Sequence, residues 1–242
     1  MAAKVEATSG YRGIGLVKLM GRRSGFIAVQ ASLASGLVDI CLIPEVPFRL
    51  DTMLAYIETI LERKGHAVVC VAEGAAQDLM RESGSGKAGE KVTLCGFSSG
   101  GDDGDAECDD SELVDVGYWL KTVIKDSLHD VDVKYIDPSY LVRSVPTASN
   151  DRIYCRMLAN GAVHAAFAGY TGVTVGLINT HFVYLPIPVV IQAPRKVDVH
   201  GELWNRLRSS IGQPNLNDPP PPRRVASSGS MASPASTPGR SW

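Results

Sequence analysis

Arginine, glutamate and tyrosine side chains follow three apolar, β-rich runs of this sequence. Arg22, Glu73 and Arg143 each come within a few residues of the end of such a run. A guanidinium presents a planar fork of donors that suits a phosphate, and a carboxylate accepts hydrogen bonds from sugar hydroxyls. Together these side chains predict a binding site for a phosphorylated polyol, although they specify no reaction.

Arg22 lies in a glycine-flanked turn between an expected strand and an expected helix. Gly21 and Gly25 would let a ligand approach the backbone, and Ser24 could cap the helix, whose first NH groups attract anions. The alternative is that Arg22 and Arg23 simply face solvent after a tight turn. The spacing of the residues does not separate these two interpretations.

Glu73 and the loop Tyr135–Arg143 leave similar alternatives. A charged Glu73 directly behind a buried strand is costly unless it accepts hydrogen bonds, so it either binds sugar hydroxyls or pairs with a nearby NH group or arginine. The loop offers two phenols and a second arginine. Arg143 and Arg22 could bracket a phosphate between them.

The composition is that of an ordinary globular protein. The chain has 242 residues, of which 45% are hydrophobic and 21% charged, and a net charge of −2, which excludes collagen-like, fibrous and wholly disordered proteins. This charge gives no electrostatic support to nucleic-acid binding. No apolar run approaches the ~20 residues of a membrane-spanning helix. We therefore expect neither nucleic acid nor a membrane as a partner.

The five cysteines form neither a metal-binding nor a disulfide pattern. They are odd in number and never at CxxC spacing, and Cys41 and Cys70 lie inside apolar runs, which is typical of buried thiols in a reducing compartment. We expect no metal ligands and a cytoplasmic protein. Met1–Gly10 contains no signal-peptide core, but a transit peptide upstream, and hence a plastid location, would leave no trace in this sequence.

Apolar runs alternate with helical patterns and predict an α/β protein with a parallel sheet. The expected strands are Ile14–Met20, Val38–Ile43, Ala67–Ala72, Asp132–Ile136 and the β-rich Val173–Leu185, and the expected helices are Ser24–Ser35, Thr52–Lys64, Glu112–Lys125 and Asp151–Ala168. Parallel sheets bind ligands beyond the carboxyl ends of their strands. Arg22, Glu73 and Arg143 all belong to that edge.

Two segments have the composition of solvated chain. Residues 83–112 are Gly/Ser-rich and then acidic, and we expect a loop insertion there, because the carboxylates do not keep calcium-loop spacing and the glycines at 100–104 lack the strand and helix of a phosphate loop. Residues 214–242 are rich in proline and serine and predict a disordered tail.

Several ordered motifs resemble the phosphofructokinase family, in the variant of plants, algae and some protists. They are Gly13-Ile-Gly-Leu-Val-Lys-Leu-Met-Gly-Arg22, Ser24-Gly-Phe-Ile-Ala28, Leu42-Ile-Pro-Glu-Val-Pro-Phe48, Val71-Ala-Glu-Gly-Ala75, Lys134-Tyr-Ile-Asp-Pro-Ser-Tyr-Leu-Val-Arg143 and Ala168-Gly-Tyr-Thr-Gly172. The resemblance covers about Glu6 to Gln213 and implies a phosphofructokinase domain over residues 1–213. It also implies that fold's two Rossmann-like lobes, with the N-terminal one largely missing here.

The resemblance implies a sugar-phosphate site. By motif match, the residues that contact fructose 6-phosphate are Met20, Gly21, Arg22, Glu73, Tyr140, Leu141, Val142 and Arg143. Arg12 matches a family arginine that reaches the sugar phosphate in a neighbouring subunit. The complete protein would be a glycolytic, allosteric homo-oligomer that transfers the γ-phosphoryl of ATP, with Mg²⁺, to the 1-hydroxyl of fructose 6-phosphate.

Two family motifs have no match in this chain. The Gly-Gly-Asp-Gly donor loop and the Thr-Ile-Asp motif, whose aspartate is the proton acceptor, precede the sugar-binding turn in the family. We therefore expect the C-terminal part of a 6-phosphofructokinase, a true fragment or an incomplete gene model, with no catalytic residue of its own and inactive in isolation. The alternatives are a pyrophosphate-dependent relative and a non-catalytic, regulatory sugar-phosphate-binding chain.

Overall fold

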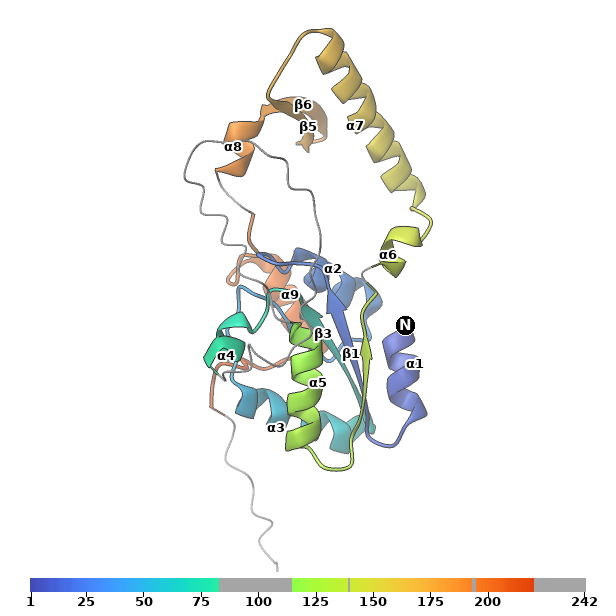
Figure 1. Cartoon of the computed structure of the whole chain (residues 1–242), viewed down its shortest axis with the longest axis vertical. Helices are drawn as coiled ribbons and strands as arrows, with labels where there is room; N and C mark the ends of the chain where they lie inside the picture. Colours follow the sequence, from blue (N-terminus) through green and yellow to red (C-terminus); the bar gives the residue numbers. More distant parts are fainter. Residues whose placement is uncertain (83–114, 139, 193–194, 220–242) are drawn as a thin grey trace, which may run out of the picture.

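Figure 1 shows the computed structural model, which describes residues 1–82, 115–138, 140–192 and 195–219. The helices are α1 (Ala2–Ser9), α2 (Phe26–Ser35), α3 (Leu50–Lys64), α4 (Gln77–Glu82), α5 (Val116–Ser127), α6 (Leu141–Ser144), α7 (Ser149–Phe167), α8 (Ile187–Ile191) and α9 (Glu202–Ile211). The strands are β1 (Gly13–Leu19), β2 (Ile40–Leu42), β3 (His66–Ala72), β4 (Asp132–Ile136), β5 (Val173–Ile178) and β6 (His181–Pro186). The expected acidic loop lies outside the described residues. No helix in the described ranges is long and apolar enough to cross a bilayer.

The first four strands form one parallel sheet in the order β2-β3-β1-β4. This confirms the expected parallel α/β architecture. Because β1 lies between β3 and β4, the carboxyl ends of these three strands are neighbours at one edge of the sheet.

Helices cover both faces of this sheet, as continuous apolar strands require. On one face, Ile14 and Leu16 pack with residues of α3 and α5 such as Ile57 and Leu120. On the other face, α2 and α9 pack together, and Trp204 of α9 is buried there. Helix α1 lies close against β1, where a Cβ at Gly13 would stand 2.0 Å from the carbonyl oxygen of Ala7. Only a glycine permits this approach.

The segment from α7 to α8 projects away from the main sheet (Figure 1). Its two strands form an antiparallel hairpin, and in the part of the chain that the structure describes they pair only with each other. Many of its apolar side chains face solvent, and Phe167 is 89% exposed. The sequence predicted one β-rich run over Val173–Leu185 among the strands of the parallel sheet; the structure instead places it in two strands of this separate hairpin, joined by a turn at Asn179 and Thr180.

The elements differ from the sequence predictions mainly at helix ends. Helix α5 begins at Val116 rather than Glu112, because the Asp115 carboxylate caps it by accepting hydrogen bonds from two backbone NH groups. Helix α3 begins at Leu50, so Asp51 lies in its first turn and not at its cap. Helices α1, α4, α6, α8 and α9 were not predicted.

The chain stays packed beyond Gln213, into the segment predicted to be a tail. The Gln213 side chain bonds both the NH and the C=O of Cys41 on the edge strand β2. Leu216 is buried in the core, and the Thr52 hydroxyl donates to the carbonyl of Asp218. Residues up to Asp218 belong to the folded part because Leu216 packs in the core and these hydrogen bonds tie the segment to β2 and α3. Residues 220–242 lie outside the described residues.

Candidate functional site at the carboxyl edge of the sheet

The sheet topology brings three of the predicted clusters to one edge. Strand β1 leads into Met20–Arg22, its neighbour β3 leads into Glu73, and its other neighbour β4 leads towards Tyr140–Arg143. Residues separated by more than a hundred positions in the sequence therefore leave the sheet side by side. This is the edge at which parallel sheets bind ligands.

Backbone hydrogen bonds join the first two clusters directly. The NH of Glu73 donates to the carbonyl of Leu19 at 2.9 Å, and the NH of Gly74 donates to the carbonyl of Gly21 at 3.0 Å. Gly74 lies so close that a Cβ there would stand 1.8 Å from the Arg22 carbonyl oxygen. Gly21 has φ of +143°, a conformation that side chains rarely adopt. The glycines are therefore required by the shape of this turn.

Arg22 and Glu73 also face each other through their side chains. Arg22 Nε lies 3.7 Å from Glu73 Oε1, with the two side chains 54% and 25% exposed. Arg22 thus reaches solvent and Glu73 has an arginine partner, as the second interpretation of each residue describes. Most of the guanidinium fork points to no other described acceptor and is open to an anion.

The helix that follows this turn starts differently from the sequence prediction. Ser24 does not cap α2; Gly25 is the cap residue, and no side chain of the cap bonds the helix. The Gly25 NH instead donates to both carboxylate oxygens of Glu45 at 3.0 Å, and Glu45 also accepts from the NH of Val197. The carboxylate of Glu45 therefore already occupies this helix start, where the sequence predicted an anion.

The Tyr140–Arg143 cluster is exposed. Tyr140 is 74% exposed, and the Arg143 guanidinium carbon lies 5.9 Å from the centre of its ring. Leu141 and Val142 are also exposed. Among the described residues, Arg143 makes no contact with Arg22, so the structure places the two arginines at one edge without joining them.

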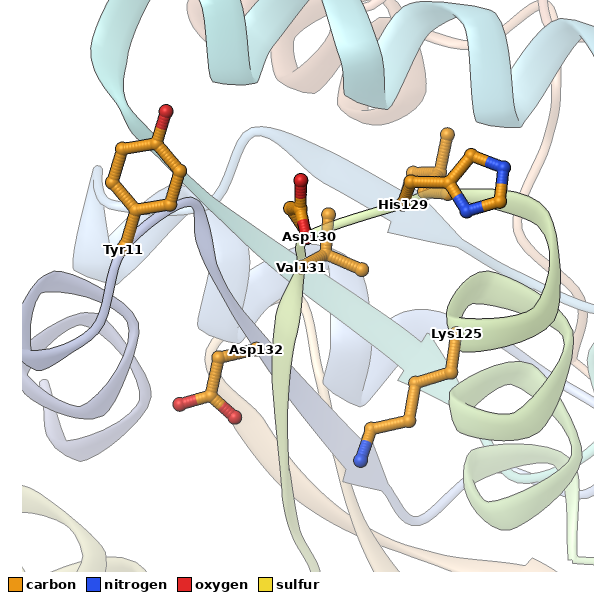
Figure 2. Close-up of a pocket in the computed structure, with 7 residues that line it drawn as sticks. Tyr11, Lys125, His129, Asp130, Val131 and Asp132 are labelled. Atoms are coloured by element: carbon orange, nitrogen blue, oxygen red, sulfur yellow. The ribbon is translucent and has the colours of Figure 1, made fainter.

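Arg12 lies at the opposite end of β1 from Arg22. It has φ of +48° and directly precedes the strand, whose seven residues span about 20 Å at ~3.3 Å per residue. Beside it, an open hollow of about 540 Å³ is lined by Tyr11, Lys125 and residues 128–132 (Figure 2). The hollow contains none of the predicted site residues.

A partly buried charged cluster, missed from the sequence, lies next to the site. It consists of Lys18, Asp115, Tyr135 and Asp137. The Lys18 ammonium lies 2.8 Å from Asp137 and 3.4 Å from Asp115, and its side chain is 11% exposed. The Tyr135 hydroxyl bonds Asp115 at 3.0 Å. The available sequence signal was a lysine on the core-facing side of β1, after Ile14 and Leu16.

The cluster keeps Lys18 protonated. Burial lowers the pKa of Lys18, but the hydrogen bond that Lys18 donates to Asp137 and the oxygens of Tyr135 and Asp115 outweigh it, so the pKa is raised overall. Burial and the Asp115 carboxylate likewise raise the pKa of Tyr135. At neutral pH the cluster therefore contains one cation and a neutral phenol.

The described residues do not provide a metal site. No group of three or more histidine, cysteine, aspartate or glutamate side chains within them could hold a metal ion. Cys41 and Cys70 are buried free thiols on adjacent strands.

The fold and this edge define an α/β protein with a parallel sheet and a glycine-rich turn carrying Arg22 after strand β1. The family model for phosphofructokinase matches residues 1–166. The chain therefore belongs to the phosphofructokinase family, which confirms the resemblance.

Two curated relatives of this chain are both named as ATP-dependent 6-phosphofructokinases. The chain is 48% identical over 218 residues to "ATP-dependent 6-phosphofructokinase 5, chloroplastic" of Arabidopsis thaliana, covering 89% of this chain and 38% of that protein. It is 40% identical over 220 residues to "ATP-dependent 6-phosphofructokinase" of Amycolatopsis methanolica, covering 88% of this chain and 45% of that protein. The chain thus spans less than half of either relative.

Solved structures show the same fold at low identity. A pyrophosphate-dependent phosphofructokinase from Marinobacter aquaeolei superposes with a TM-score of 0.57 and 17% identity, over 87% of this chain and 50% of that one. A second such enzyme, from Nitrosospira multiformis, superposes with a TM-score of 0.54 and 18% identity, over 99% of this chain and 58% of that one. At these identities the structures establish the fold alone.

Proposed function

We propose that this chain supplies the fructose 6-phosphate site of an ATP-dependent 6-phosphofructokinase. The observation that carries the proposal is the convergence of Arg22, Glu73 and the Tyr140–Arg143 cluster on the carboxyl edge of three adjacent strands. Arg22 and Arg143 would bind the phosphate, and Glu73 would accept from the sugar hydroxyls. Arg12, at the far end of β1, would serve a neighbouring subunit of a homo-oligomer.

The task of these residues in phosphoryl transfer is to position the acceptor. Catalysis of this reaction rests on positioning and charge stabilisation more than on covalent chemistry by the protein. The turn between Met20 and Arg22 would fix the phosphate end of the sugar, which aligns the distant 1-hydroxyl with the donor. The described residues fit no metal, so we assign Mg²⁺ no ligand here and derive no step through it. The proton acceptor and the nucleotide loop belong to the part of the family protein that this chain does not match.

The names of the curated relatives support ATP over pyrophosphate as the donor. Relatives at 40–48% identity are named ATP-dependent, whereas the pyrophosphate-dependent structures are only 17–18% identical. The cytoplasm is the proposed compartment, and a plastid is the alternative because one relative is named chloroplastic.

A hybrid enzyme tests the proposal. This chain is joined to the part of the Arabidopsis chloroplastic relative that precedes the matched segment, and the product is assayed for fructose 1,6-bisphosphate with ATP or pyrophosphate. We expect turnover with ATP alone. Turnover with pyrophosphate alone would reassign the donor, and a folded hybrid that neither binds fructose 6-phosphate nor turns over would refute the proposal.

A further inference from the structure

The partly buried cluster around Lys18 lies where two of the site segments leave the sheet. In the β1–β4 pairing, Val17 stands opposite Ile136, so Lys18 is the next residue of β1 and Asp137 is the first residue after β4. Lys18 is two residues before Met20, and Asp137 is three before Tyr140. Their 2.8 Å ion pair therefore joins the segment that leads to Arg22 to the segment that leads to Arg143.

Asp115 holds Lys18 from the other side. Its carboxylate accepts from the backbone NH groups of Gly117 and Tyr118 at the start of α5 and from the Tyr135 hydroxyl. This carboxylate is therefore fixed by the helix and the neighbouring strand. Lys18, bonded to it at 3.4 Å, cannot turn away from Asp137 without leaving Asp115.

Stability alone does not explain a lysine at this position. Ile14 and Leu16 on the same face of β1 are fully buried apolar residues, and a third apolar side chain would continue that core. The ion pair with Asp137 need not offset this loss of packing, because the Lys18 charge gives up its water on burial, whereas a pair whose other member is 36% exposed contributes little stability. What the ion pair does supply is a fixed geometry between two chain segments.

We propose that Lys18 is a positioning residue, which through its ion pair with Asp137 holds the Tyr140–Arg143 segment in register with the Met20–Arg22 turn for binding the sugar phosphate. This inference rests on the proposed function. Lys18 itself need not touch the ligand, since its side chain is 11% exposed and already has two carboxylate partners.

The main variant is Asp137→Asn, because Asp137 is the most exposed of the three charged members at 36% and its change leaves Lys18 paired with Asp115. Lys18→Met removes the cation, and Lys18→Arg restores it. The matched control is Lys134→Met, which removes an ion pair with Asp132 on the same strand at 3.2 Å, between side chains 44% and 42% exposed.

Two measurements are made on these variants. Fructose 6-phosphate binding to the full chain Met1–Trp242 is measured by calorimetry, and KM and kcat are measured in the hybrid. A misplaced binding group weakens substrate affinity but leaves the enzyme folded and the chemical step intact. We therefore expect Asp137→Asn and Lys18→Met to raise Kd and KM by about tenfold or more, with kcat unchanged. Lys18→Arg should recover most of the affinity, and Lys134→Met should match the wild type. A fall in kcat at unchanged KM would indicate a merely structural role and overturn the inference.

Amide hydrogen exchange of residues 140–144 in the full chain, without ligand, tests the positioning by itself. Exchange there should accelerate in Asp137→Asn and Lys18→Met and stay unchanged in Lys134→Met. If the wild-type chain and hybrid fail to bind fructose 6-phosphate, the proposed function fails and this exchange alone decides whether Lys18 positions the segment. Unchanged exchange in both variants would overturn the inference.

Discussion

Replacing Gly74 with alanine should damage the sugar-phosphate site while leaving the sheet folded. A Cβ at this position would lie 1.8 Å from the Arg22 carbonyl oxygen, whereas real Cβ atoms essentially never come within 3.0 Å of a neighbour. The Arg22 backbone must therefore retreat by about 1 Å, and a misplacement of ~1 Å can cost roughly a hundredfold in function. At ~1.4 kcal/mol for each factor of ten, this corresponds to about 2.8 kcal/mol of binding free energy.

The assay is titration of the hybrid with fructose 6-phosphate, and the control is Gly36→Ala. Gly36 has φ of +60°, and no neighbouring heavy atom lies within 4 Å of the position that a Cβ would take, so alanine there should cost about 1–2 kcal/mol of stability without weakening binding. Circular dichroism establishes that both variants are folded. A folded Gly74→Ala protein that binds fructose 6-phosphate as tightly as wild type would refute the reasoning, because the turn would then not depend on this close approach.

Three other outcomes are expected. Arg22→Ala removes charge-assisted hydrogen bonds of ~1.5–3 kcal/mol each, so the KM of the hybrid should rise about tenfold or more; an unchanged KM and kcat would mean that Arg22 only faces solvent. The chain Met1–Trp242 alone should not phosphorylate fructose 6-phosphate, and turnover well above blank in a coupled assay would contradict this. The pKa values of Lys18 and Tyr135 are raised on folding, so this cluster's stability is fully present below their unfolded values of about 10 and is lost as the pH rises above them. Denaturant titrations should show that loss above about pH 10 in the wild type and a smaller one in Lys18→Met; equal slopes would contradict it.

The strands and the edge of the site followed from the sequence because their signals are local. The apolar run Ala67–Ala72 and the helical spacing within Thr52–Lys64 predict their elements without knowledge of the rest of the chain. The predicted strands also define where each strand ends, and this places Arg22 and Glu73 just beyond two of those ends. The two alternatives for Glu73 could not be separated, because its partner Arg22 lies in the turn after a different strand.

What could not be predicted depends on long-range pairing. The sequence pattern does not predict that β1 lies between β3 and β4. The contact between Lys18 and Asp137 therefore could not be predicted. The neighbours of Ser24 in the chain suggest it as the cap of α2, but Glu45 reaches that helix start from another loop. Similarly, Leu216 stands among prolines and polar residues, and only its packing in the core shows that it is not part of a tail.

The most direct test of the proposed site is the footprint of fructose 6-phosphate on the hybrid, measured by hydrogen exchange with and without the sugar. We expect protection in peptides that cover residues 20–25, 73–77 and 140–144, and its loss in Arg22→Ala. Protection confined to residues 128–132, which line the hollow shown in Figure 2, would contradict the proposed site, as would an unchanged exchange pattern at saturating sugar.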